Sequence, residues 1–435
     1  MIGTLSHTRT FDCQNAKRAS VPSQETISQP VAFSERVKRR RPLRPRASGK
    51  TTPIELRGNL LHRPDLRANL RATYDWIERS RSPRNGGSRA YYAPVLGWSR
   101  TYPETTGYII PTVLRTGAVL KDDGALQRAR SFGEFLVDIQ QPEGGWFGLT
   151  WPPKRSAGLS VFNTAQILKG LTALARATDE PVWLESASRG AGWLAGGVDG
   201  NGMWSAGGYR SETNPSYYTQ VAWPMLEVWA LTGERTLRDA AVRVLEAAVA
   251  RRTLLGGFRG WGFGASDLAF THTIAYTLRG FLESARLLGE WERYGKPVLP
   301  ALRRLAEDAV AGRGRLPGAY SAQWEPERWY TCLTGNVQIA ICLLLAARRC
   351  NDALFPTAAR ALIEETCRQQ SLQHPIPDLR GAVAGSAPIW GRYMRGRYPN
   401  WAAKYLCDAI VALLEEPAGE ASAGAPADRC PTMSG

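Results

Sequence analysis

Two kinds of helical segment alternate along most of this chain. Segments such as 221–231 and 337–347 are apolar nearly all round, and helices of that kind must be buried on most sides. Between them lie amphipathic segments, in which apolar residues recur at helical spacing and the other positions are charged. We expect these amphipathic helices at 65–79, 126–140, 181–196, 236–252, 296–311 and 352–370. The alternation predicts antiparallel hairpins, each with one buried and one half-solvated helix.

A repeated unit precedes each of the apolar helices. It begins with glycine, continues through an irregular polar and aromatic stretch, and ends at a polar residue that starts the helix. In the first unit the irregular stretch includes residues 102–108, Tyr-Pro-Glu-Thr-Thr-Gly-Tyr. The glycines recur every 55 to 63 residues, at Gly87, Gly145, Gly202, Gly257, Gly318 and Gly381. The expected helix starts are Thr106, Asn163, Tyr218, His272, Thr334 and Asn400.

Six such units determine the expected fold, because internal repeats set the architecture. Six buried helices wrapped by six amphipathic ones form an all-α (α/α)6 toroid. A linear solenoid is the alternative, but it would expose one side of the apolar helices. In the toroid the six irregular stretches gather at one end of the barrel, which we call the mouth. We expect the toroid over residues 56–416, a basic disordered tail at 1–55 and a disordered tail at 417–435.

Charge and composition narrow the function classes. Residues 1–50 carry half of the formal charge of +16, and this stretch has no apolar periodicity, so it is expected to be a solvated tail. The milder positive charge of the body indicates an acidic ligand rather than nucleic acid. The four histidines lack metal-ligand spacing, so we expect no metal and no cofactor.

The seven scattered cysteines favour reduced thiols and a cytoplasmic protein. No signal-peptide core and no apolar run of membrane-spanning length is visible in the sequence. The sequence leaves the oligomeric state open.

The Gly144-Gly145-Trp146 run and the 102–108 stretch resemble the six-hairpin, (α/α)6-toroid superfamily of carbohydrate-active proteins. That group includes unsaturated glucuronyl hydrolases, N-acylglucosamine 2-epimerase-like enzymes, polysaccharide lyases and glucuronyl C5-epimerases. The resemblance covers roughly residues 60–416 and is architectural. It implies a carbohydrate-active enzyme, and it assigns no catalytic residue.

A weaker resemblance points to terpene cyclases, whose domains are also α-toroids. Residues 140–146, Gln-Gln-Pro-Glu-Gly-Gly-Trp, fit their Gln-x3-Gly-x-Trp repeat. However, the Asp-x-Asp-Asp acid of those cyclases is absent from this sequence, and Asp122-Asp123 lies in a loop between helices.

Carboxyl groups at the mouth suit glycoside hydrolysis, which needs an acid for the leaving oxygen and a second carboxylate as base or nucleophile. Glu104 is the first candidate, because Tyr102 and Tyr108 can desolvate it and raise its pKa. Asp267 is the second candidate. The other acidic residues of these stretches are Glu143, Glu212, Glu325 and Glu327.

An eliminase or epimerase needs different groups: a base for the C5 proton of a uronate and donors for its carboxylate. His272 is the only histidine at an expected inner-helix start, and Tyr276 follows one turn later on the same face. Arg392 offers bidentate binding of a carboxylate. Further candidate substrate-binding residues are Tyr108, Trp146, Asn163, Gln166, Tyr218, Asn336, Gln338, Trp390 and Tyr393.

The sequence therefore predicts an enzyme that processes an acidic, uronate-containing saccharide, most directly by hydrolysis with carboxylates. Elimination or epimerisation by His272 and Tyr276 is the main alternative. A terpene cyclase-like protein and a non-catalytic glycan-binding toroid are the others.

Overall fold

The computed structural model describes residues 63–208, 214–263 and 268–416. The chain divides into two units, Met1–Thr51 and Thr52–Gly435, and only the second contains described residues. The predicted tails at 1–55 and 417–435 lie outside the described residues. The helices and the candidate site all belong to the second unit.

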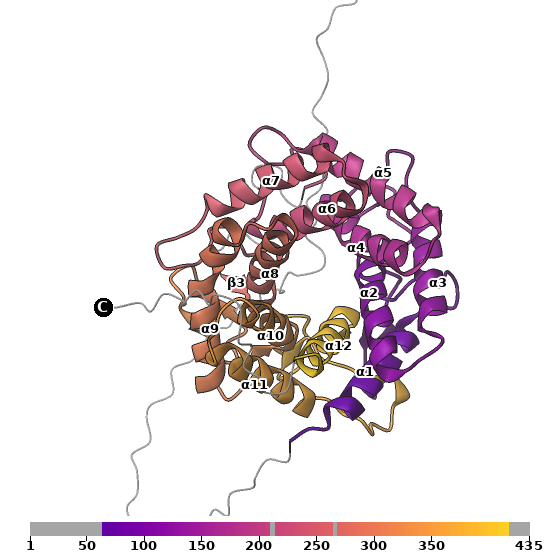
Figure 1. The fold of residues 1–435 in the computed structure, drawn as a ribbon. Coiled ribbons are helices and arrows are strands. Elements are labelled where there is room, and N and C mark those ends of the chain that lie inside the picture. Colours follow the sequence, from indigo (N-terminus) through magenta and orange to yellow (C-terminus); the bar gives the residue numbers. More distant parts are fainter. Residues whose placement is uncertain (1–62, 209–213, 264–267, 417–435) are drawn as a thin grey trace, which may run out of the picture. The chain divides into compact units, whose positions relative to one another are not determined.

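Helices of two classes alternate through the described residues and form two concentric rings (Figure 1). The inner helices are α2 (Pro103–Leu120), α4 (Val161–Ala177), α6 (Thr219–Thr232), α8 (Thr271–Leu288), α10 (Leu333–Ala347) and α12 (Asn400–Leu414). The outer helices are α1 (Leu66–Ser80), α3 (Ala125–Asp138), α5 (Pro181–Gly197), α7 (Arg235–Val249), α9 (Leu299–Ala311) and α11 (Leu354–Arg368). This arrangement confirms the predicted (α/α)6 toroid.

Burial separates the two classes as their sequences predict. Along α12 every residue from Asn400 to Leu413 is buried, because the helix has neighbours on most sides. On α7 the buried residues are three or four positions apart, and the other face is charged and solvated. The buried set of α7 is Leu237, Ala240, Ala241, Val244, Leu245 and Ala248.

The ring is closed by its last inner helix. Helix α12 packs against both α1 and α2, the first two helices of the chain. The Asn400 side-chain amide at the start of α12 donates to Ser88 Oγ at 2.8 Å, to the Arg89 carbonyl at 2.9 Å and to Thr105 Oγ1 at 2.9 Å. These contacts rule out the linear solenoid.

Short antiparallel strands link the irregular stretches that precede neighbouring inner helices. Strands β2, β1 and β8 form one sheet, β3, β4 and β5 a second, and β6 and β7 a third. The pairing of β1 with β8 joins the first stretch to the last. The strands are β1 (Tyr91–Ala93), β2 (Gly97–Trp98), β3 (Ala269–Phe270), β4 (Ala319–Tyr320), β5 (Pro326–Glu327), β6 (Thr331–Cys332), β7 (Ser386–Ala387) and β8 (Tyr398–Pro399). Single-turn helices lie at Ser216–Tyr218, Trp291–Gly295, Lys296–Val298 and Pro377–Leu379.

Glycine permits a close approach between inner helices at the crossing of α2 and α4. A Cβ on Gly170 would lie 2.3 Å from the Gly107 carbonyl oxygen, and a Cβ on Gly107 would lie 2.5 Å from Ile167 Cα. Both contacts involve backbone atoms, so no side-chain rotation can relieve them. The glycine of the 102–108 stretch therefore serves helix packing.

Helix α2 begins three residues earlier than the sequence pattern indicates, at Pro103. Proline suits the first helical turn, because its missing N–H has no intrahelical acceptor there. The earlier start places Glu104 inside the first turn of an inner helix rather than in the preceding loop. None of the described helices is long and apolar enough to cross a membrane.

Candidate functional site

The mouth of the toroid is the end at which all six inner helices begin. Because each outer helix runs antiparallel to its inner partner, the inner helices point in one direction and their first turns converge. Backbone N–H groups and the helix dipoles place positive partial charge there. The mouth is therefore suited to binding a negatively charged group.

Glu104 lies at the mouth, in the first turn of α2, and is only 7% exposed. Burial raises the pKa of this carboxyl to about 7, while a hydrogen bond with Tyr102 and the positive charge of Lys169 oppose the shift. A carboxyl group with this pKa exchanges its proton at neutral pH, as a general acid or base must.

Asn163, in the first turn of α4, is the direct neighbour of Glu104. With its amide oriented to satisfy both ends, its nitrogen donates to Glu104 Oε2 at 3.0 Å and to Ser160 Oγ at 3.3 Å. Its oxygen accepts from the Leu149 backbone N–H at 3.1 Å. Asn163 therefore fixes the direction of the Glu104 carboxyl group.

His272 begins α8, on the opposite side of the ring from α2 (Figure 1). Its Nδ1 donates to Gln338 Oε1 at 2.7 Å, because a glutamine carbonyl oxygen can only accept. This assigns the proton to Nδ1 and leaves the lone pair on Nε2. Burial lowers the pKa of His272 to about 4, and the hydrogen bond with Gln338 opposes this shift. The imidazole is therefore neutral at physiological pH.

A cluster of packed tyrosine rings lies between these two helix starts. The ring of Tyr276 lies 4.3 Å from that of His272 and 6.5 Å from that of Tyr405, and Tyr108 lies 5.9 Å from Tyr405. Tyr393 reaches His272 from the last loop, at 5.0 Å between ring centroids. Burial raises the pKa values of Tyr108, Tyr276 and Tyr393 well above 10, and the charge of Glu104 adds to each shift. Glu104 and this tyrosine cluster therefore belong to one site.

Polar groups continue inward from Glu104. The Lys169 ammonium, two turns into α4, donates to Gln166 Oε1 at 2.7 Å and to Gln220 Oε1 at 2.6 Å. It also lies 4.1 Å from the centroid of the Trp223 ring. Burial and the charges of Arg279 and Lys404 lower its pKa. Gln166 thus binds a buried lysine side chain beneath the mouth.

Trp146 corrects the sequence interpretation, which had placed it among the substrate-binding residues. It is fully buried, and its indole Nε1 donates to the Leu136 carbonyl of α3 at 2.8 Å. A Cβ on Gly190 of α5 would contact its ring at 2.8 Å, so the side chain points into the packing between inner and outer helices. Trp204 repeats this arrangement one unit later, donating to the Leu194 carbonyl at 2.9 Å. The Gly-Gly-Trp run is therefore a packing motif.

Asn336 is a second correction. Its Nδ2 donates to the Gly314 carbonyl at 2.9 Å, and its Oδ1 accepts from the Leu316 backbone N–H at 3.3 Å. Both ends of the amide are thus committed to the loop between α9 and α10. The side chain has no exposed surface, so it holds that loop rather than a ligand.

Of the remaining aromatic and cationic residues near the mouth, some contact the site and others are exposed at the surface. Tyr217, which the sequence analysis did not select, lies 6.3 Å from Tyr276, whereas its neighbour Tyr218 packs edge-on against Trp204 at 5.6 Å. Trp390 is 64% exposed, so no tight pocket holds it. The Arg392 guanidinium is half-exposed and pairs with Glu327 at 3.1 Å.

Of the acidic candidates, Glu104 is the one that the described residues bury at the mouth. Glu143 and Glu325 are exposed, and Glu327 is engaged by Arg392. Asp267 and Glu212 lie outside the described residues. Nor do the described parts of the chain gather three His, Cys, Asp or Glu residues that could hold a metal ion.

Tyr405, Lys169 and Lys404 are site residues that the sequence interpretation did not select. The signal for the two lysines was present, because a charged residue within an otherwise buried helix needs a specific partner. Lys404 Nζ lies 4.1 Å from the Tyr405 ring centroid and forms an ion pair with Asp408.

No protein-family model and no curated protein sequence matches this chain. Solved structures do match its fold. An unsaturated glucuronyl hydrolase specific for heparin superposes with a TM-score of 0.63 at 13% identity, covering 80% of this chain and 97% of that one. Cellobiose 2-epimerase from Bacillus thermoamylovorans gives a TM-score of 0.62 at 12% identity, covering 79% of this chain and 98% of that one.

A sugar epimerase from a ruminal bacterium gives a TM-score of 0.63 at 13% identity, with 80% of this chain and 97% of that one covered. A mutant of the unsaturated glucuronyl hydrolase from Streptococcus agalactiae, complexed with dGlcA-GalNAc6S, gives 0.59 at 10% identity, with 85% and 99% covered. At these identities the likeness establishes the fold alone, which is an (α/α)6 toroid.

Proposed function

We propose that this protein is a carbohydrate-active enzyme that hydrolyses a glycosidic bond of an acidic, uronate-containing saccharide at the mouth of the toroid. One observation carries the proposal: Glu104 is buried at the mouth, with a pKa raised to about 7. Carboxylic acids that protonate a glycosidic oxygen at neutral pH need a pKa in this range.

In this mechanism Glu104 donates its proton to the leaving oxygen, and Asn163 holds the carboxyl in the required direction. A second carboxylate must activate water or attack the sugar directly. Asp267 is our candidate for that role, since it precedes α8 in the sequence, and α8 lies across the ring from Glu104.

The positive potential of the six helix starts and the buried Lys169 favour an anionic substrate. The fold neighbours support the same class, because they include glucuronyl hydrolases, one of them complexed with dGlcA-GalNAc6S.

Epimerisation or elimination is the second candidate, and the state of His272 favours it specifically. A neutral imidazole with its lone pair on Nε2 can take a proton from carbon, and Gln338 fixes this tautomer. In this mechanism Glu104 and His272 are the two groups that carry protons, and they lie in the first turns of helices on opposite sides of the mouth. Epimerisation needs such a pair, because a proton leaves one face of the sugar carbon and another is added to the opposite face. The sugar epimerases among the fold neighbours have the same toroid.

Separate variants of the two proton carriers distinguish the candidates. Uronate oligosaccharides are incubated with the wild type, Glu104→Gln, His272→Ala and the exposed control Glu143→Gln. Hydrolysis predicts reducing-end release that Glu104→Gln lowers at least about 100-fold, the scale of general acid catalysis, and that Glu143→Gln leaves unchanged.

Elimination instead predicts absorbance from an unsaturated product, and epimerisation predicts solvent-deuterium uptake at C5, both of which His272→Ala abolishes. A wild-type protein that binds these saccharides but changes none of them would contradict the enzymatic proposal. It would support a glycan-binding toroid.

A further inference from the structure

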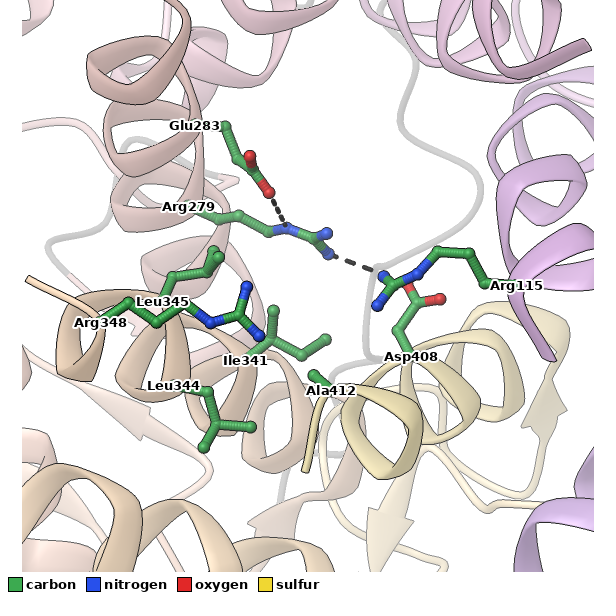
Figure 2. A pocket seen from close by; sticks show the side chains of 9 residues that line it. All are labelled: Arg115, Arg279, Glu283, Ile341, Leu344, Leu345, Arg348, Asp408 and Ala412. Atoms are coloured by element: carbon green, nitrogen blue, oxygen red, sulfur yellow. Dashed lines mark ion pairs between the residues drawn. The ribbon is translucent and has the colours of Figure 1, made fainter. Parts of the chain in front are cut away.

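A polar cavity lies between the middle and C-terminal parts of the inner helices, away from their starts at the mouth (Figure 2). Its volume is about 50 Å³, and its charged lining comes from four inner helices. Arg115 of α2, Arg279 of α8 and Arg348 at the end of α10 face it, together with Glu283 of α8 and Asp408 of α12. Its residues occupy the middle and C-terminal parts of these helices, and neither Glu104 nor His272 is among its lining residues.

The central group of this cavity is the Arg279 guanidinium. Its side chain is 10% exposed, and its buried Nε has no hydrogen-bond partner among the described residues. The guanidinium carbon lies 5.0 Å from the centroid of the Trp223 ring and 6.0 Å from that of the Tyr405 ring. Its closest carboxylate oxygens, on Glu283 and Asp408, lie 3.6 and 3.9 Å away, beyond hydrogen-bond distance. A buried N–H group without an acceptor is costly, so an acceptor in the cavity would stabilise Arg279.

The charges of Glu283 and Asp408 raise the pKa of Arg279 against the effect of burial, but other groups engage both carboxylates as well. Asp408 Oδ2 pairs with Lys404 Nζ, and its Oδ1 accepts from Thr112 Oγ1 at 2.7 Å. Glu283 Oε2 accepts from Arg286 Nε at 3.1 Å. The lining as a whole therefore keeps a surplus of positive charge.

Attraction to the negative C-terminal ends of the helices explains only some of the three cavity arginines. Arginines commonly neutralise the negative ends of helices, and Arg348 at the C-cap of α10 fits that role. Arg279 does not fit it, because it lies in the middle of α8. The side chains of the Arg115–Glu415 and Arg348–Glu416 pairs are up to half-exposed, and ion pairs that water reaches contribute little.

We propose that this cavity binds a small inorganic oxyanion, held by Arg279 with Arg115 and Arg348. Guanidinium groups match the oxygens of such ions in a bidentate fashion. The volume of about 50 Å³ is far below the roughly 300 Å³ of pockets for organic ligands, so a sugar ring does not fit. The site bridges α2, α8 and α10, and its occupant stabilises the inner ring away from the mouth.

The test uses the full chain with sulfate as the probe, and selenate for crystallography. Calorimetry at constant ionic strength measures sulfate binding to the wild type, Arg279→Gln, Arg348→Gln and the exposed control Arg84→Gln. Chloride replaces sulfate in a parallel titration, because sulfate also stabilises proteins through general exclusion from their surface. We expect saturable sulfate binding that is weakened at least 10-fold in both cavity variants and unchanged in Arg84→Gln. An anomalous selenate peak is expected among the three arginines.

Two results would overturn the proposal. One is equal sulfate binding by the wild type and Arg348→Gln, a half-exposed position where substitution should not impair folding even if Arg279→Gln does. The other is a selenate-soaked crystal in which the cavity holds only water. Neither result bears on the proposed catalytic site, since neither involves Glu104 or His272.

Discussion

The protonation of Glu104 depends on opposing contributions of its neighbours. Removal from water favours the neutral acid, whereas the hydrogen bond with Tyr102 and the charge of Lys169 favour the carboxylate. Dehydration prevails, and the pKa rises from 4.5 to about 7. Glu104 is therefore ionised more readily in the unfolded chain than in the folded one, which gives a measurable pH dependence of stability.

We expect the contribution of Glu104 to stability to be full below pH 4.5 and to be lost as the pH rises through 7. The sign follows because the folded state binds the proton more tightly than the unfolded state. Comparing the wild type with Glu104→Gln by urea unfolding between pH 4 and pH 8 should show a relative loss of roughly 3 kcal/mol. Glu143→Gln is the control, and its unfolding should follow the wild type at every pH. A constant difference between the wild type and Glu104→Gln would show that Glu104 is ionised in the fold.

Replacing Trp146 tests whether it packs the hairpin or contacts substrate. Trp146→Phe removes the hydrogen bond to the Leu136 carbonyl and leaves a small void, at an expected cost of about 2–4 kcal/mol. Trp204→Phe, the equivalent change one unit later, should cost a similar amount. Thermal unfolding measures both, and saccharide affinity should stay within about 2-fold of the wild type. Weaker saccharide binding by a fully stable Trp146→Phe protein would restore its role as a ligand contact.

At the scale of the elements, the crossing of α2 and α4 sets the spacing of two neighbouring walls of the mouth. Gly170→Ala would drive a methyl group against the Gly107 carbonyl oxygen, and we expect a loss of about 3 kcal/mol. Gly192→Ala in α5 is the matched control, because no atom lies within 4 Å of its added Cβ. Helix propensity should make that variant more stable by up to about 1 kcal/mol. Equal stabilities of the two variants, measured by urea unfolding, would mean that α2 and α4 can separate without cost.

The helices could be predicted because their apolar periodicity is a local property of the sequence. Many of the site residues could not be predicted in this way. Apolar runs and amphipathic segments place each helix to within a few residues, and the glycine repeat gives the number of hairpins. Trp146 and Tyr217 show what is missing: both lie in the irregular stretches that precede inner helices, and only side-chain direction separates a packing residue from one that reaches Tyr276. That direction depends on contacts between segments that are far apart in sequence. Lys169 and Arg279 did carry a local signal, as charges within buried helices.

At the scale of the whole described ring, stability depends on how its first and last segments meet. Asn400→Ala removes three hydrogen bonds that join the start of α12 to Ser88, Arg89 and Thr105. We expect a loss of about 2–4 kcal/mol, because buried acceptors on the partner segments lose their donor. Hydrogen exchange followed by mass spectrometry should show the largest loss of protection in 88–105 and 398–414. A uniform loss of protection around the ring, or no loss, would contradict a local role for Asn400 in closure.

Closure also restricts how a protein of this kind can change in size. A linear array of hairpins tolerates the duplication or deletion of a unit, because only its capping repeats must keep a polar outer face. Here each hairpin fills about a sixth of a circle, and α12 must meet both α1 and α2. Adding a hairpin would widen the inner ring. Removing one would leave the apolar faces of two hairpins without a packing partner. We therefore expect the lineage of this chain to vary in its loops and to keep its number of hairpins.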